Sequence, residues 1–220
     1  MNNTFSIKRF GLLFKKTLLE RPMQLFGFTG LVLAFVLILY VACKSLIGLN
    51  AAQNITFIWG LDGGGFFLAS FIFSYFSSNA SGSSYLTLPA SHFEKWLCGV
   101  LIAGILYVFV FLLFFRVMDT AFVEIYHRSL DINSPFYKSQ YESVYIFPFD
   151  GVVARKVYPM FLFLTGAMLI GSLYFNKVSF IKVALAICVF CIGGFSLNWL
   201  MAKALFGHII DSGPFNHLTF

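Results

Sequence analysis

The sequence predicts an all-α polytopic membrane protein, with an N-terminal amphipathic helix in the membrane interface and about five transmembrane helices. Of its 220 residues, 59% are hydrophobic and only 11% are charged. Long apolar segments recur along the chain, and basic residues gather ahead of the first of them. A soluble domain of this size needs more polar side chains to cover its surface. The composition therefore excludes a soluble enzyme, a disordered chain and a small disulfide-linked scaffold.

Residues 1–22 form the predicted N-terminal region, which contains the amphipathic helix. Four apolar residues recur at helical spacing: Ile7, Phe10, Phe14 and Leu18. Four basic residues form the other face: Lys8, Arg9, Lys15 and Lys16. Such a helix is suited to lying in the interface of the lipid bilayer, and Pro22 ends it. The alternative is a basic leader surrounded by water.

Five segments of the predicted transmembrane domain, residues 23–203, reach the ~20 apolar residues that cross ~30 Å of hydrocarbon. Because the segments are long and continuous rather than alternating, they indicate helices and not a barrel. An outer loop at 116–156 and a short C-terminal tail at 204–220 complete the domain organisation. The predicted spans are about 25–43, 55–76, 96–115, 157–175 and 183–201.

The distribution of Lys and Arg predicts the orientation in the cytoplasmic membrane. The basic residues before the first span place the N-terminus in the cytoplasm, because positive charge beside a span normally stays on that side. The loop between the second and third spans is then cytoplasmic. The loop at 116–156 faces outside, and an odd number of spans places the C-terminus outside as well.

The second predicted span contains an acidic residue, Asp62, followed by a run of glycines. An ionisable group within a span is costly and is often functional. Glycines spaced by four allow another helix to approach closely, and consecutive glycines weaken a helix. Two interpretations stay open, a substrate path or gate and close helix packing. The residues concerned are Gly60, Asp62, Gly63, Gly64 and Gly65.

Motifs for catalysis, metal binding or nucleotide binding are absent from the sequence. No glycine-rich phosphate loop occurs, and the histidines are scattered. Cys188 and Cys191 form a C-x-x-C within a predicted span, where cysteine acts as a small hydrophobic residue. The sequence thus predicts no catalytic residue, no metal site, no cofactor bound by this chain and no nucleic-acid partner.

The segment before the third span carries a helix-start pattern. Ser91 is a suitable N-cap, and Glu94 stands three residues later, at the spacing of a capping box. Pro89 precedes the cap, and Trp96 begins the apolar run. A short capped helix is therefore expected to lead into the third span. A plain turn with a cap is the simpler alternative.

This segment resembles the "LPAS…EK" signature of the membrane subunits of type-2 ABC transporters. The basic helix ahead of the first span is also similar to the connecting helix of that family, and residues 171–175 with 180–182 resemble a turn common in its bacterial members. The resemblance implies that the chain is one of two membrane subunits of an exporter and that each subunit has six spans, whereas this sequence shows five. It also implies a homodimer or heterodimer with a second permease chain and separate ABC ATPase subunits that hold ATP and magnesium. By this resemblance the ATPase-coupling role falls on Leu88, Pro89, Ser91, Glu94 and Lys95.

Two functions follow as hypotheses. The first is the permease subunit of an ABC-type exporter, which is not itself an enzyme. The second is a non-transporting membrane scaffold or accessory protein, which binds a partner through its aromatic-rich outer loop. An intramembrane enzyme has little support, because Asp62 stands alone in the interior of the spans.

Overall fold

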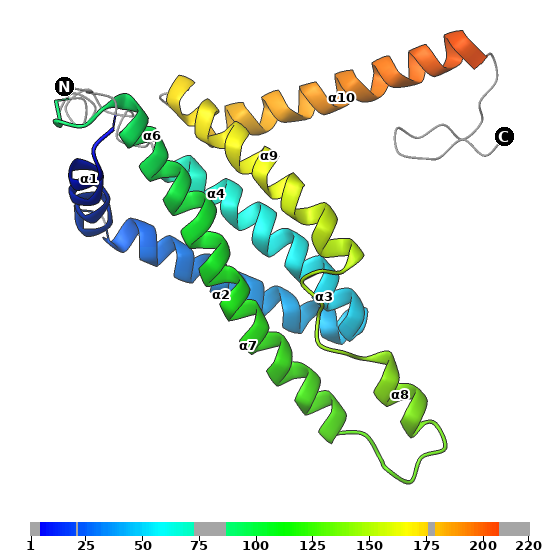
Figure 1. The fold of residues 1–220 in the computed structure, drawn as a ribbon. Helices are drawn as coiled ribbons and strands as arrows, with labels where there is room; N and C mark the ends of the chain where they lie inside the picture. Colours follow the sequence, from blue (N-terminus) through cyan, green and yellow to red (C-terminus); the bar gives the residue numbers. More distant parts are fainter. Residues whose placement is uncertain (1–4, 21, 73–86, 176–178, 207–220) are drawn as a thin grey trace.

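The computed structural model describes residues 5–20, 22–72, 87–175 and 179–206, which form a bundle of helices (Figure 1). No strand occurs within these ranges, and five helices are long and apolar enough to cross a membrane. The all-α polytopic prediction is thus confirmed. The tail at 204–220 lies outside the described residues from residue 207 onward, as do residues 73–76 of the predicted second span. The five helices are Leu25–Leu46, Leu49–Ile72, His92–Arg128, Val152–Tyr174 and Phe180–Met201.

Helix α1 (Ile7–Glu20) packs through one apolar face, and α2 (Pro22–Leu46) follows it. The buried face of α1 is centred on Leu13 and includes Phe10, Phe14 and Leu18, as predicted. Ile7 differs from the prediction, since it is 77% exposed and lies away from that face. Helix α1 ends at Glu20, and Pro22 is the first residue of α2, a position at which a proline is tolerated.

The second span begins earlier than predicted, at Leu49. It comprises α3 (Leu49–Ile58), the π-helical turn η1 (Trp59–Gly63) and α4 (Gly64–Ile72). Gly48 has a φ of 104° and makes the tight turn from α2. Hydropathy misses the first turns of α3 because they carry polar side chains. Asn50 donates a hydrogen bond to the Ser143 carbonyl and Gln53 donates one to Asp119, so these side chains have partners in other segments.

The third span is a continuous helix made of α6 (His92–Val100), the π-helical turn η3 (Leu101–Leu106) and α7 (Tyr107–Arg128). Its 37 residues correspond to about 55 Å, well beyond the ~30 Å of a hydrocarbon core. Residues 116–128, predicted as part of the outer loop, are therefore helical. The outer segment proper is 129–151, which contains the short helix α8 (Tyr137–Ser143).

Helices α9 (Val152–Tyr174) and α10 (Ser179–Phe206) complete the fold. Helix α9 packs along η1 and α4, whereas α10 extends away from the bundle (Figure 1). The start of α10 contacts α9 where Val183 lies against Gly171. Helix α10 is exposed along most of its length, so the bundle is built mainly from the first four spans.

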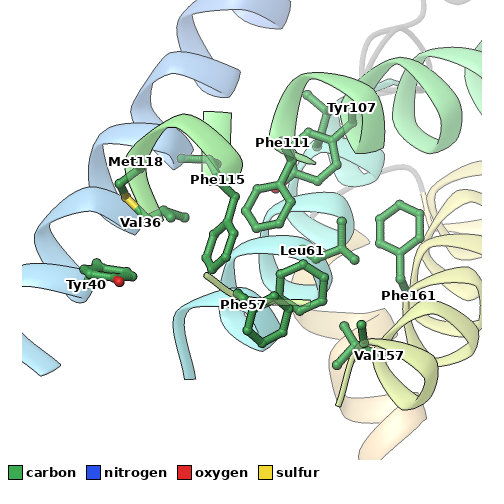
Figure 2. Packing of buried hydrophobic residues seen from close by; sticks show 14 residues of the cluster. Val36, Tyr40, Phe57, Leu61, Tyr107, Phe111, Phe115, Met118, Val157 and Phe161 are labelled. Atoms are coloured by element: carbon green, nitrogen blue, oxygen red, sulfur yellow. The ribbon is translucent and has the colours of Figure 1, made fainter. Parts of the chain in front are cut away.

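The largest core cluster is aromatic. Figure 2 shows the rings of Phe57, Phe111 and Phe115 together with Leu61 and Phe161 between the helices. The rings of Phe57 and Phe115 meet edge to face at 5.3 Å, and those of Phe57 and Phe111 lie 5.9 Å apart. Between apolar helices in lipid, such close packing is a main source of association.

Candidate functional site

The candidate site lies at the end of the bundle where α1 meets the start of α6 (Figure 1). The predicted capping box is present. The Glu94 amide donates to Ser91 Oγ at 3.1 Å, and the Ser91 amide donates to Glu94 Oε2 at 2.9 Å. These bonds satisfy orphan amides at the helix start and set the direction in which the 37-residue helix leaves it.

The same carboxylate connects α6 to the N-terminal helix. Glu94 Oε1 accepts a hydrogen bond from the Ser6 amide at 2.6 Å and pairs with Arg9 Nη2 at 3.3 Å. The Glu94 side chain is fully buried, while Arg9 is partly exposed. One buried acid therefore holds the start of α1, the helix cap and the first turn of α6 together.

A groove runs between α1 and residues 88–90. It joins two sets of residues that the sequence analysis singled out separately, the basic helix and the LPAS segment. Its lining is apolar along the floor and basic at the rim, formed by Arg9, Leu12, Leu13, Lys16, Leu88, Pro89 and Ala90. Lys8 and Lys15 are exposed on α1 and do not line it.

Burial divides the predicted coupling residues into two groups. Pro89 is exposed, and Leu88 and Ser91 are partly exposed, so a partner can reach this segment. Glu94 and Lys95 are buried, so their side chains do not reach a partner protein, and they act on the exposed residues of this segment only by holding them in position. The sequence analysis missed two exposed neighbours, His92 and Phe93. The signal was available, since both belong to the first turn after the cap.

The glycines of the second span are packing positions. A side chain at Gly60 would meet the Phe111 ring, one at Gly64 would meet the Tyr107 hydroxyl, and one at Gly65 would meet the Phe161 ring. Gly63 is different, because its nearest neighbour, the Trp59 ring, would be 3.9 Å away. The glycine run does not break the helix. Gly63 closes the π-helical turn, in which the carbonyl of Gly60 accepts a hydrogen bond from the Tyr107 hydroxyl, and Gly64 and Gly65 begin α4.

Asp62 lies within this π-helical turn and is 4% exposed. Neither of its carboxyl oxygens has a hydrogen-bond partner among the described residues. Close packing thus accounts for Gly60, Gly64 and Gly65, and it leaves Asp62 without an explanation.

A third buried carboxylate, Asp119, was not predicted as a site. Asp119 Oδ1 accepts hydrogen bonds from the Tyr40 hydroxyl and from Gln53 Nε2, both at 2.8 Å. Asp119 Oδ2 accepts one from the Phe147 amide at 2.8 Å, and Gln53 also donates to the Tyr145 carbonyl at 2.9 Å. These bonds attach the outer segment to α2, α3 and α7. The available signal was Tyr40 within the apolar α2 and Gln53 in the polar first turns of α3.

No group of three or more His, Cys, Asp or Glu side chains is arranged to hold a metal ion within the described ranges. The four cysteines are unbonded thiols. Cys43 and Cys98 are buried, whereas Cys188 and Cys191 are exposed on α10.

Comparison with known proteins finds no matching family model, no similar curated protein and no similar solved structure.

Proposed function

We propose that this chain is the membrane-spanning permease subunit of an ABC-type exporter in the cytoplasmic membrane, with its N-terminus in the cytoplasm. ATP and magnesium would bind to a separate ABC ATPase chain, and two permease chains would pair as a homodimer or a heterodimer. The proposal starts from the LPAS segment and the basic N-terminal helix, which resemble those of type-2 ABC transporter permeases.

The observation that carries the proposal is the buried connection between Glu94 and α1. Motion transmitted from an ATPase to the spans needs a surface that a partner can reach and a stiff link behind it. Pro89, His92 and Phe93 supply exposed groups beside the cap. The capping box and the pair of Glu94 with Arg9 make the surface continuous with both α1 and α6.

The long third helix supports the same function. A displacement at the first turn of α6 would reach Arg128, about 55 Å away along an unbroken helical axis. Two π-helical turns, η1 and η3, interrupt the regular geometry partway along the second and third spans. Such turns are frequent at functional sites and allow local adjustment without breaking a helix.

Purification in mild detergent tests the proposal directly. A separate ATPase chain is expected to co-purify, and its activity in reconstituted complexes should depend on the contact between α1 and α6. Arg9→Glu should lower the coupled ATPase activity, whereas Arg9→Lys, which keeps a positive charge beside Glu94, should retain most of it.

The matched control is the exposed pair of Arg128 with Glu124 at the other end of the third span, where the charged atoms are 3.4 Å apart. Reversal of both charges there should leave the activity unchanged. The proposal fails if no ATPase chain co-purifies and Arg9→Glu has no more effect than the control.

A second candidate, a non-transporting scaffold, is favoured by the outer segment. Asp119 holds residue 147 and Gln53 holds residue 145 against the bundle, while Phe136, Tyr141 and Tyr145 are exposed. A fixed segment with exposed aromatic rings is suited to binding an external protein. Capture of an external partner by the wild-type chain, lost on Tyr141→Ala with Tyr145→Ala, would favour this function over transport.

A further inference from the structure

Asp62 is a buried acid without a hydrogen-bond partner among the described residues, within a helix long and apolar enough to cross a membrane. A polar group without a partner in an apolar interior is costly, and ionisable residues inside spans often mark substrate or ion pathways. The surroundings of Asp62 therefore indicate which ligand would offset this cost.

Aromatic rings are the first feature of these surroundings. The Tyr107 hydroxyl packs against the helix that carries Asp62, since it would overlap a Cβ at Gly64. That hydroxyl donates its proton to the carbonyl of Gly60, so the proton is not available to Asp62. The Tyr107 ring stacks on the Phe161 ring, with centroids 6.3 Å apart and planes 20° from parallel. The helix that carries Asp62 thus packs against aromatic side chains, and none of the described residues donates a hydrogen bond to the acid.

The second feature is an apolar groove between α6–η3 and α9. Its walls include Val100, Gly104, Leu162 and Gly166, and its floor includes Phe161 and Thr165. Leu162 and Ile170, on the rim, are 69% and 66% exposed, so the groove opens toward the lipid-facing side of the bundle.

The floor of the groove packs against the helix of Asp62 at Gly65. This glycine packs directly on Phe161 and Thr165, and it lies three residues after Asp62 on the same helix. Residues three apart on a helix are neighbours. Thr165 is buried, and its hydroxyl also has no hydrogen-bond partner within the described ranges.

We propose that Asp62 and this groove form a binding site for a lipophilic cation, an organic ammonium or phosphonium. The apolar groups of the ligand would occupy the groove, and the Phe161 ring would move aside so that the cation reaches Asp62. Aromatic faces attract organic cations, and a buried acid gains most from an opposite charge. A divalent metal would need several oxygen or nitrogen ligands, and the described residues offer no such group. As a substrate site this inference rests on the proposed exporter function, whereas as a binding site it needs no ATPase.

The test uses the purified full chain, without any ATPase, in nanodiscs of phosphatidylcholine. This lipid has no net charge, so binding to anionic lipid does not contribute. Radiolabelled tetraphenylphosphonium should bind saturably. Asp62→Asn should weaken its affinity at least tenfold, while Asp62→Glu should largely retain it.

Two further variants separate the acid from the groove. Gly166→Leu places a side chain in the groove without changing Asp62, so it should also weaken binding. The fold can accept a side chain at this position, because a Cβ at Gly166 meets no atom within 4 Å. Glu124→Gln removes an exposed acid from α7 and should leave the affinity unchanged.

The inference is overturned if the wild-type chain shows no saturable binding, if Asp62→Asn binds as tightly as the wild type, or if Glu124→Gln weakens binding equally. Since the assay contains no ATPase, failure here would leave the exporter proposal standing. Failure to co-purify an ATPase would, in turn, leave this binding site standing.

Discussion

Replacement of Asp119 by Asn should loosen the outer segment and destabilise the whole chain. Asp119 accepts hydrogen bonds on both carboxyl oxygens, from Tyr40 and Gln53 on one and from the Phe147 amide on the other. An Asn side chain has one oxygen and one NH2 group. If the Asn NH2 group takes the place of Oδ2, it faces the Phe147 amide, and if it takes the place of Oδ1, it faces the donors of Tyr40 and Gln53.

The size of the effect follows from the number of donors without an acceptor. Each costs about 1–3 kcal/mol, and the orientation that keeps the oxygen toward Tyr40 and Gln53 leaves one donor unpaired, so Asp119→Asn should lower the free energy of unfolding by about 1–3 kcal/mol. Tyr40→Phe removes one donor and leaves Gln53 on the same oxygen, so it should cost only about 1 kcal/mol. Asp131→Asn is the matched control, because Asp131 is exposed in the same outer segment and its carboxylate accepts a hydrogen bond from the nearby Asn133 amide.

Two measurements check this prediction. Titration of the purified chain with SDS, followed by tryptophan fluorescence, gives the loss of stability. Hydrogen exchange of the peptide around Phe147 reports whether the outer segment has separated from the bundle. If Asp119→Asn costs no more than Asp131→Asn, or if exchange at Phe147 stays unchanged, the proposed role of Asp119 is refuted.

Two other predictions concern packing and exposure. Gly64→Ala should cost about 1–3 kcal/mol in the same SDS titration, because its methyl group would overlap a tyrosine hydroxyl, while Gly63→Ala has room and should be tolerated. The thiol of Cys188 should react with a membrane-permeant maleimide well before that of Cys98, because α10 exposes the first and the bundle buries the second; equal rates by mass spectrometry would contradict the packing of α10.

Much of the fold could be predicted because its signals are local. The apolar face of α1 follows from residues that recur every three or four positions, and the capping box follows from Ser91 and Glu94 three residues apart. The five spans follow from the length and continuity of the apolar segments. Each of these features depends on neighbours in the sequence, so no knowledge of the tertiary structure is needed.

The parts that could not be predicted depend on partners far apart in the sequence. Arg116 and Asp119 suggested a loop after the third span, yet the helix continues through them to Arg128. Their charges are compensated by the outer segment, since Arg116 donates to the Phe147 carbonyl at 3.1 Å and Asp119 accepts from the Phe147 amide. The contact between Arg9 and Glu94 likewise joins residues 85 positions apart. A hydropathy or spacing rule contains no term for such partners.

The contrast among the buried acids gives the strongest reason to regard Asp62 as a ligand site. In the described part of the chain three carboxyl groups are buried, those of Asp62, Glu94 and Asp119. Glu94 receives two backbone amides besides the Arg9 guanidinium, and Asp119 receives three donors. The fold therefore supplies partners where a buried acid serves structure. Asp62 receives none within the described ranges, and the Tyr107 hydroxyl, which packs on the same helix at Gly64, donates to the carbonyl of Gly60. A side chain kept for packing alone would be better as Asn or Leu at this position, because neither carries a group that the apolar surroundings penalise as strongly. The lack of a partner at Asp62 within the described ranges is therefore the observation on which the proposed cation site rests.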